Sequence, residues 1–217
     1  MTRYLLLGVC ASLAGLMLLA PDAMAQKWEF GGGVGGSFYV SREITNGGTA
    51  AIAKLRTNVA SGVWLGNNGS GRWGGEVRYD YQRGELDLTR GATSATFGAE
   101  THALHYDILW HARPTGAKIR PFLAAGGGVK VYRATGQEVL VQPLSQYALL
   151  TRTKDVRPML SLGVGVKWRI SRSLQFRLEV HDYITPFPRE VIVPNVGSSV
   201  SGVLHNIVPL AALAYTF

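Results

Sequence analysis

Histidines and carboxylates occur two residues apart in two stretches of the sequence, and this is the combination of residue types that could do chemistry. His105 and Asp107 form one such pair, and Glu179 and His181 form the other. In an extended chain this spacing puts both members on one face, where they could bind a metal ion or, with a serine, attack a lipid ester. Because no signature fixes a nucleophile, we expect these groups to hydrogen-bond in a polar interior, with no catalytic residue, metal or cofactor.

The stretch "GGGVGG" matches the G-x-G-x-x-G pattern through Gly31, Gly33 and Gly36. Phosphate binding by this pattern needs a helix N-terminus directly after the glycines. Here "SFYV" continues a strand pattern instead. We therefore expect the glycines to make room for neighbouring side chains.

The elements that position these residues are predicted from alternation of apolar and polar residues. Eight segments show it: 28–40, 54–66, 72–84, 98–112, 119–133, 157–170, 174–185 and 205–217. The connections between them alternate long and short. An even strand number with tight turns at one end and long loops at the other is typical of an outer-membrane barrel. The predicted fold is all-β, an eight-stranded antiparallel up-and-down transmembrane β-barrel.

The two faces of these strands differ in side-chain volume. In "WGGEVRYDYQRG" aromatic residues alternate with charged ones, and other strands alternate bulky apolar residues with glycine, alanine or charge. An eight-stranded barrel has an interior only wide enough for side chains to fill it, so the bulky face is predicted to face lipid. The inward charge network is then Glu76, Arg78, Asp80, His105, Asp107, Lys130, Lys167, Arg169, Arg177, Glu179 and His181. Its slight cationic excess predicts that any water path would prefer anions. A soluble ligand-binding barrel, with the bulky face inside, is the alternative.

Tryptophan positions give a second indication of a membrane. The predicted topology places all five at the rim with the short turns: Trp28, Trp64, Trp73, Trp110 and Trp168. Indole rings favour the boundary between acyl chains and headgroups. One strand conflicts with this, because inward Lys54 and Arg56 also put Trp64 inward; a β-bulge near Ser61–Gly62 would reconcile the two.

The first 25 residues have the pattern of an export signal. Arg3 precedes the apolar run "LLLGVCASLAGLMLLA", and "AMA" before Gln26 is a small-residue cleavage site. We expect residues 1–25 to be cleaved and residues 26–217 to form one barrel domain. The net charge of +8 is unchanged by this removal, since Arg3 and Asp22 cancel. No cluster of Lys and Arg suggests a nucleic-acid partner.

The last strand, "IVPLAALAYTF", alternates apolar residues and closes on Tyr215 and Phe217. It resembles the C-terminal signal that the barrel-assembly machinery of bacterial outer membranes recognises. With the export signal and eight strands, the chain resembles the small outer-membrane β-barrel family typified by the OmpA transmembrane domain and by OmpX. The resemblance implies insertion into the cell outer membrane of a Gram-negative bacterium, with its lipids and the assembly machinery as partners, and brings no catalytic residues. No peptidoglycan-binding domain is expected after Phe217.

Three roles stay open at this point. The first is a non-enzymatic barrel with a structural or loop-mediated role, whose extracellular partner the sequence does not identify. The second is a narrow, anion-leaning, porin-like pore, and the third is an enzyme that modifies lipid A. The segment 134–156 is apolar enough to pack over the barrel mouth or to continue the fifth strand as a hairpin.

Overall fold

The computed structural model describes residues 28–217 except 57, 69, 70 and 140, so the predicted signal peptide lies outside the described residues. The chain forms strands joined by turns and loops. In chain order these are β1 (Trp28–Tyr39), β2 (Arg42–Asn46), β3 (Thr49–Leu55), β4 (Asn58–Asn67), β5 (Trp73–Arg90), β6 (Thr93–His111), β7 (Ile119–Ala134), β8 (Ala148–Leu150), β9 (Lys154–Arg169), β10 (Leu174–Pro186), β11 (Ile192–Pro194), β12 (Ser198–Ser199) and β13 (Val203–Thr216). None of the described residues belongs to a helix long and apolar enough to cross a membrane.

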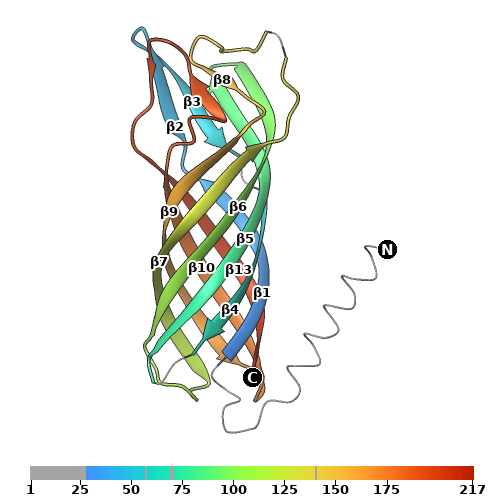
Figure 1. The fold of residues 1–217 in the computed structure, drawn as a ribbon, viewed down its shortest axis with the longest axis vertical. Helices are drawn as coiled ribbons and strands as arrows, with labels where there is room; N and C mark the ends of the chain where they lie inside the picture. The colour runs from blue at the N-terminus through green and yellow to red at the C-terminus, as the bar shows by residue number, and fades with distance from the viewer. Residues whose placement is uncertain (1–27, 57, 69–70, 140) are drawn as a thin grey trace, which may run out of the picture.

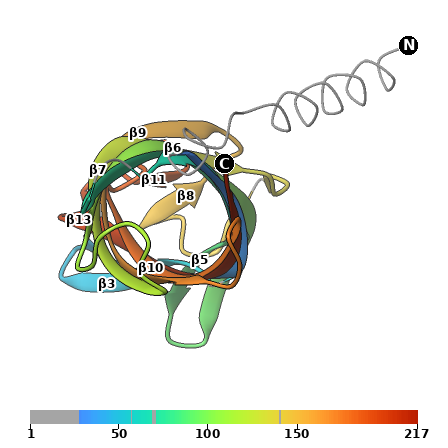
Figure 2. The same cartoon turned by 90° about the horizontal axis from the view of Figure 1, so that it is seen from below.

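Eight long strands close into a ring. The hydrogen-bonded order is β5-β4-β1-β13-β10-β9-β7-β6, and β6 pairs with β5 again. All of these pairs are antiparallel, and the views along and across the axis show a tall cylinder (Figures 1 and 2). The predicted eight-stranded up-and-down barrel is confirmed. We call the end with the short turns and the C-terminus the turn end, and the opposite end the loop end.

The loop end contains more strand than the sequence predicted. Segment 85–97 is not a long loop, because β5 and β6 continue to a tight turn in which Gly91 has a φ of +57°. Segment 41–53 holds the β2–β3 hairpin, whose Gly47 and Gly48 also have positive φ. Glycine adopts such a φ without steric cost. The predicted strand 54–66 divides into β3 and β4, and β3 pairs with the upper part of β5.

β4 has no bulge near Ser61–Gly62, so the possible reconciliation of Trp64 with the membrane rim does not occur. β4 pairs without interruption with β1 from Asn58 to Asn67 and with β5 from Ala60 to Asn67. An unbroken register keeps strict alternation, so Trp64 has the same inward orientation as Gly62. Trp64 is 2% exposed.

The outward face of the ring is an apolar belt. Leu104, Tyr106, Ile108, Leu162 and Val164 are each about half exposed, as lipid-facing side chains of a bare barrel must be. The inward face is built from charged and small residues. Gly35 and Gly126 illustrate the tight spacing, because a Cβ atom at either position would collide with a carbonyl oxygen of the adjacent strand.

The loop end is closed by an apolar cluster, which we call the apolar cap. It joins Ile44 of β2, Leu88 of β5 and Ile192 of β11 with Tyr147 and Leu150 from the segment after β7, all nearly inaccessible. β8 pairs with β11, so segment 134–156 reaches across to the connection before β13. It therefore packs over the mouth, as one of the two predicted arrangements proposed.

Candidate functional site: the barrel lumen

The layer of the lumen nearest the turn end is organised by Glu29, which the sequence analysis missed. Its carboxylate accepts hydrogen bonds from Trp64 Nε1 at 3.0 Å, Asn68 Nδ2 at 3.2 Å and Lys167 Nζ at 2.8 Å. Gly31 makes this packing possible, because a Cβ there would enter the Trp64 ring. The assignment of Trp64 to the membrane rim is therefore wrong: its indole N–H finds a buried carboxylate instead.

The middle of the lumen is built around Arg177 of β10. Its guanidinium donates two hydrogen bonds to Glu76 of β5, at 2.7 and 2.9 Å. Its Nε also lies 2.5 Å from Glu179, and the guanidinium carbon lies 4.6 Å from the centre of the Trp64 ring. The planar guanidinium of Arg177 thus pairs with Glu76 through two hydrogen bonds and stacks on the Trp64 ring.

Arg78 and His105 continue the network toward the loop end. Arg78 forms ion pairs with Glu76, Asp80 and Glu179. The His105 ring lies between two carboxylates, with Nδ1 3.1 Å from Asp107 and Nε2 3.1 Å from Asp80. The β5–β6 register sets this up, since Arg78 faces His105 and Glu76 faces Asp107.

Ser161, His181 and Glu179 lie in an order that resembles a hydrolytic triad. Ser161 Oγ is 3.3 Å from His181 Nδ1, and His181 Nε2 is 3.4 Å from Glu179. Ser161 also donates to Asp107 at 3.2 Å. Both Ser161 and His181 are fully buried. An acyl-transfer site needs space for substrate beside the nucleophile, whereas these groups are surrounded by their own partners.

Three of the same side chains have a spacing suited to a metal ion. Ligand atoms of Glu76, Asp107 and His181 lie within 4.8 Å of one another. Each already has a partner: Glu76 accepts from Arg177, Asp107 from Ser161, and His181 contacts Glu179. A metal would have to displace these contacts, so the donor set fits a self-satisfied network better than an open metal site.

The layer nearest the apolar cap combines one ammonium group with uncharged partners. Lys130 Nζ bonds Asn206 at 2.5 Å and lies 4.9 Å from the centre of the Tyr39 ring. Gln82 accepts hydrogen bonds from Ser37 and Tyr39 at 2.9 and 2.8 Å. Sequence reasoning missed Gln82, Asn206 and the tyrosines because it searched the inward face only for charge. Their inward alternation was the available signal.

Arg169 differs from the other predicted network residues. It is exposed at the turn end and borders a hollow there, and it has no ion pair among the described residues. The buried cations on the inward face are Arg78, Arg120, Lys130, Lys167 and Arg177. The buried carboxylates are Glu29, Glu76, Asp80, Asp107 and Glu179. The two sets are equal in number, so these buried residues do not show the cationic excess that the sequence predicted.

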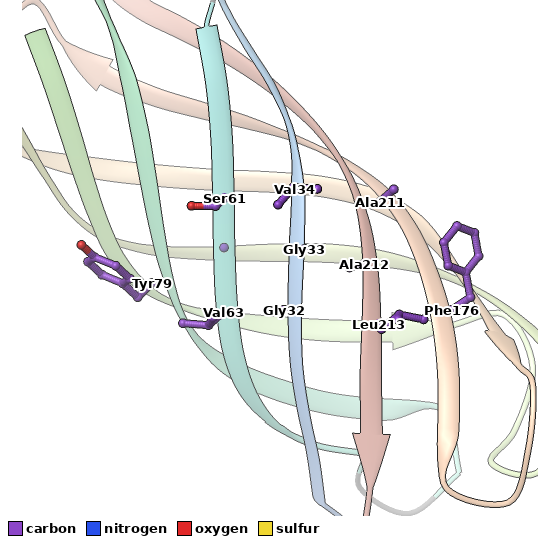
Figure 3. Close-up of a pocket in the computed structure, with 11 residues that line it drawn as sticks. Gly32, Gly33, Val34, Ser61, Val63, Tyr79, Phe176, Ala211, Ala212 and Leu213 are labelled. Carbon is purple, nitrogen blue, oxygen red and sulfur yellow. The ribbon is translucent and has the colours of Figure 1, made fainter. Parts of the chain in front are cut away.

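A hollow also marks the lipid-facing wall, and we call it the wall hollow (Figure 3). Its volume is about 460 Å³, and it crosses β13, β1 and β4 between Phe176 on one side and Tyr79 on the other. The hollow forms because Gly32, Ser61 and Ala211 face outward where neighbouring strands carry larger residues. The hollow is almost entirely apolar, as a surface in contact with acyl chains should be.

The other four tryptophans lie at the turn end of the wall. Trp28, Trp73, Trp110 and Trp168 are between 37% and 60% exposed. Tyr215 and Phe217 stack with ring centroids 6.4 Å apart. Their recognition by an assembly machinery stays a prediction.

Quenching by lipids with brominated acyl chains should separate Trp64 from these four. We expect part of the fluorescence of the reconstituted protein to resist quenching, and Trp64→Phe to abolish that part, because the lumen excludes lipid. Trp73→Phe is the matched control and should remove quenchable signal. An unchanged resistant fraction in Trp64→Phe would place this ring outside.

Together the closed ring, the charged lumen and the apolar belt define the class: a transmembrane β-barrel with a filled interior. No family model matches the sequence, and no curated protein matches it. Solved structures do match. The outer membrane protein OprG from Pseudomonas aeruginosa aligns with a TM-score of 0.56 and 12% identity, over 89% of this chain and 96% of that one.

Two further solved structures match at similarly low sequence identity. The outer membrane protein AlkL in lipid bilayers gives a TM-score of 0.50 at 12% identity, covering 91% of this chain and 94% of its own. The outer membrane protease OmpT from Escherichia coli gives 0.50 at 9% identity, covering 91% and 98%. At these identities the likeness concerns the fold alone. The chain has the fold of small outer-membrane β-barrel proteins, as the sequence resemblance predicted.

Proposed function

We propose that this chain is an integral outer-membrane β-barrel, exported by its N-terminal signal, with a closed lumen and a structural or loop-mediated role. The turn end then faces the periplasm and the loop end the cell exterior. The fold of the matching outer-membrane proteins and the apolar belt support the membrane location.

The observation that carries the proposal is the filled lumen. Arg78, Asp107 and Arg177 have no exposed surface. Arg78 pairs with Glu179 and Arg177 with Glu76 across the barrel, and Asp107 pairs with His105 on its own strand. The apolar cap lies above them. Ions crossing the barrel would have to break several buried ion pairs and enter an apolar layer, and each step is costly.

Planar bilayer recordings test the closed lumen. We expect the inserted protein to give no conductance steps in concentrated salt at either polarity, because paired side chains fill the lumen and the apolar cap lies over it. Protein-free detergent is the control, and heat-modifiable gel migration checks that the sample is folded. Discrete steps with anion selectivity would favour the pore instead.

The loop end offers the surface for an interaction role. Val141 and Val196 are 86% and 94% exposed, although the segments that carry them are held to the barrel. Asn195 Nδ2 donates to Ser145 O at 3.0 Å, and Asn46 Nδ2 reaches Gln146 O at 2.5 Å. Ordered loops that present apolar side chains to solvent are suited to binding another molecule.

An enzymatic role has less support. The candidate Ser161–His181 pair is buried within the network rather than beside a cleft. We propose that its work is hydrogen bonding. Unchanged lipid A masses in cells with and without the protein are the expected result, and a shifted species would overturn this part of the proposal.

A further inference from the structure

Positive charge is concentrated at the turn end of the barrel. Five exposed cationic side chains lie in or beside the short turns: Arg72, Arg113, Lys118, Arg169 and Arg172. The described residues of these turns include no Asp or Glu, and Glu29, in the adjoining layer of the lumen, is buried against Lys167. Most of the net charge of +8 therefore sits on this one surface.

The loop end is different, because its cations are interspersed with carboxylates. Arg56 pairs with Asp87 at 2.7 Å, Arg133 with Glu100 at 3.0 Å and Arg157 with Asp155 at 2.7 Å. Over the described residues, Lys118, Arg169 and Arg172 have no such ion pair. Unpaired like charges repel one another, so this surface is suited to an anionic partner.

Three of these cations border one hollow of about 440 Å³, together with Ile170 and Ser171; we call it the turn-end hollow. Two turns are joined there, because Arg169 N donates to Lys118 O at 2.9 Å. The backbone thus holds cations from the β6–β7 and β9–β10 turns around a shared space. A phosphate group is the anion that such a convergence of Lys and Arg suits.

Apolar surface leads from this hollow into the membrane. Ile170 is 59% exposed, and its N–H donates to Leu174 O at 2.9 Å. Phe176 is the next residue on the outward face of β10 and borders the wall hollow. Trp168, 49% exposed, pairs with Phe176 in the β9–β10 register. Cations next to membrane-facing aromatic rings indicate the headgroup level of a bilayer.

We propose that the turn-end hollow binds the phosphate of an anionic phospholipid in the periplasmic leaflet, with Lys118, Arg169 and Arg172 as its cations. The inference rests on the proposed outer-membrane function. An acyl chain of that lipid runs past Leu174 and Phe176 along the wall. A lipid fits better than a soluble anion because the cations adjoin the apolar belt directly.

Brominated lipids test this, because Trp28, Trp73, Trp110 and Trp168 all lie at the same end. The mature protein is reconstituted in phosphatidylcholine vesicles that hold either brominated phosphatidylglycerol or brominated phosphatidylcholine at equal mole fraction. One cation near an anionic lipid surface gives about fivefold enrichment. We expect the apparent local concentration of phosphatidylglycerol to be at least about fivefold higher than that of phosphatidylcholine. The preference should be smaller in high salt, which screens charge.

Two triple variants with equal loss of charge localise the effect. Lys118→Gln, Arg169→Gln and Arg172→Gln together should remove most of the preference. Lys54→Gln, Arg83→Gln and Lys154→Gln remove three exposed cations from the loop end and should leave the preference intact. Both variants should keep heat-modifiable migration.

Other outcomes of these experiments would contradict either the lipid site or the proposed function. Equal quenching by both lipids in the unmodified protein, or equal loss in both triple variants, would overturn the lipid site. If free glycerol phosphate abolishes the preference for phosphatidylglycerol, the hollow is a site for soluble phosphate and the lipid proposal is wrong. If the protein shows no lipid preference but sediments with peptidoglycan, and the Lys118, Arg169 and Arg172 triple variant does not, the hollow is a cell-wall contact instead. Failure to insert at all would instead contradict the proposed function, so the two failures are distinguishable.

Discussion

Arg177→Met should lower the free energy of unfolding by about 3–5 kcal/mol, the usual effect of removing one partner from a buried ion pair. The guanidinium contacts Glu76 through two hydrogen bonds and lies 2.5 Å from Glu179 and 3.6 Å from Glu29. Methionine fills similar volume but leaves those buried carboxylates short of a cation. Their mutual repulsion and lost solvation are the cost.

Urea unfolding in lipid vesicles, followed by tryptophan fluorescence and by gel migration, measures this loss. Arg83→Met is the matched control: Arg83 faces outward near the loop end and is exposed, so its replacement should change stability by no more than about 0.5 kcal/mol. The double variant Glu76→Met, Arg177→Met should lose less free energy of unfolding than the sum of the two single variants, since it leaves no unpaired carboxylate at position 76. Equal stability of Arg177→Met and the unmodified protein would contradict the network.

Strand alternation was sufficient to predict the barrel and most of the lumen network. Bulky and small faces are local properties, and a narrow barrel admits only one assignment of them. Alternation placed Trp64 inside, but the preference of indole for the membrane boundary was given more weight. The inward placement of Lys54 and Arg56, from which that alternation was counted, is wrong, because both are exposed in the structure. Glu29, the hydrogen-bond partner of Trp64, also has the inward alternation, so the pair was accessible in principle.

The apolar cap could not be predicted in the same way. Its contacts join segments far apart in the sequence, such as Leu150 with Ile192 in the β8–β11 pair. Local patterns do not specify which loop lies over which. The extended β5–β6 hairpin is a different case. Leu86 and Leu88 alternate with polar residues, and Gly91 is a residue typical of tight turns, so the sequence contained the signals for this hairpin.

Arg169 marks another limit of sequence reasoning. It has the inward alternation, but Lys167, two residues earlier, is the last buried inward residue of β9, and Arg169 is exposed. Alternation gives the face of a strand and not the depth at which the barrel opens. That depth decides whether a cation balances buried carboxylates or contributes to a surface that attracts anions.

Leu162→Arg carries the second large expected effect, a loss of about 2–4 kcal/mol, because an arginine near the middle of the lipid-facing wall must enter acyl chains or distort the bilayer. Leu162 is 45% exposed and lies between Leu160 and Val164 on the outward face of β9. The same substitution on a soluble barrel surface would be almost neutral. The variant therefore tests which solvent the belt meets.

Val141→Arg is the comparison that makes the result specific. Val141 is even more exposed, at 86%, but it belongs to the loop end, where arginine meets water and should change stability by less than about 0.5 kcal/mol. Both variants are unfolded in urea from vesicles of one composition. If Leu162→Arg is as stable as Val141→Arg, the apolar belt is in contact with something other than lipid, and the membrane orientation of every strand must be reassigned. A large loss confined to Leu162 means that exposure to lipid, rather than exposure as such, determines which residues this wall tolerates.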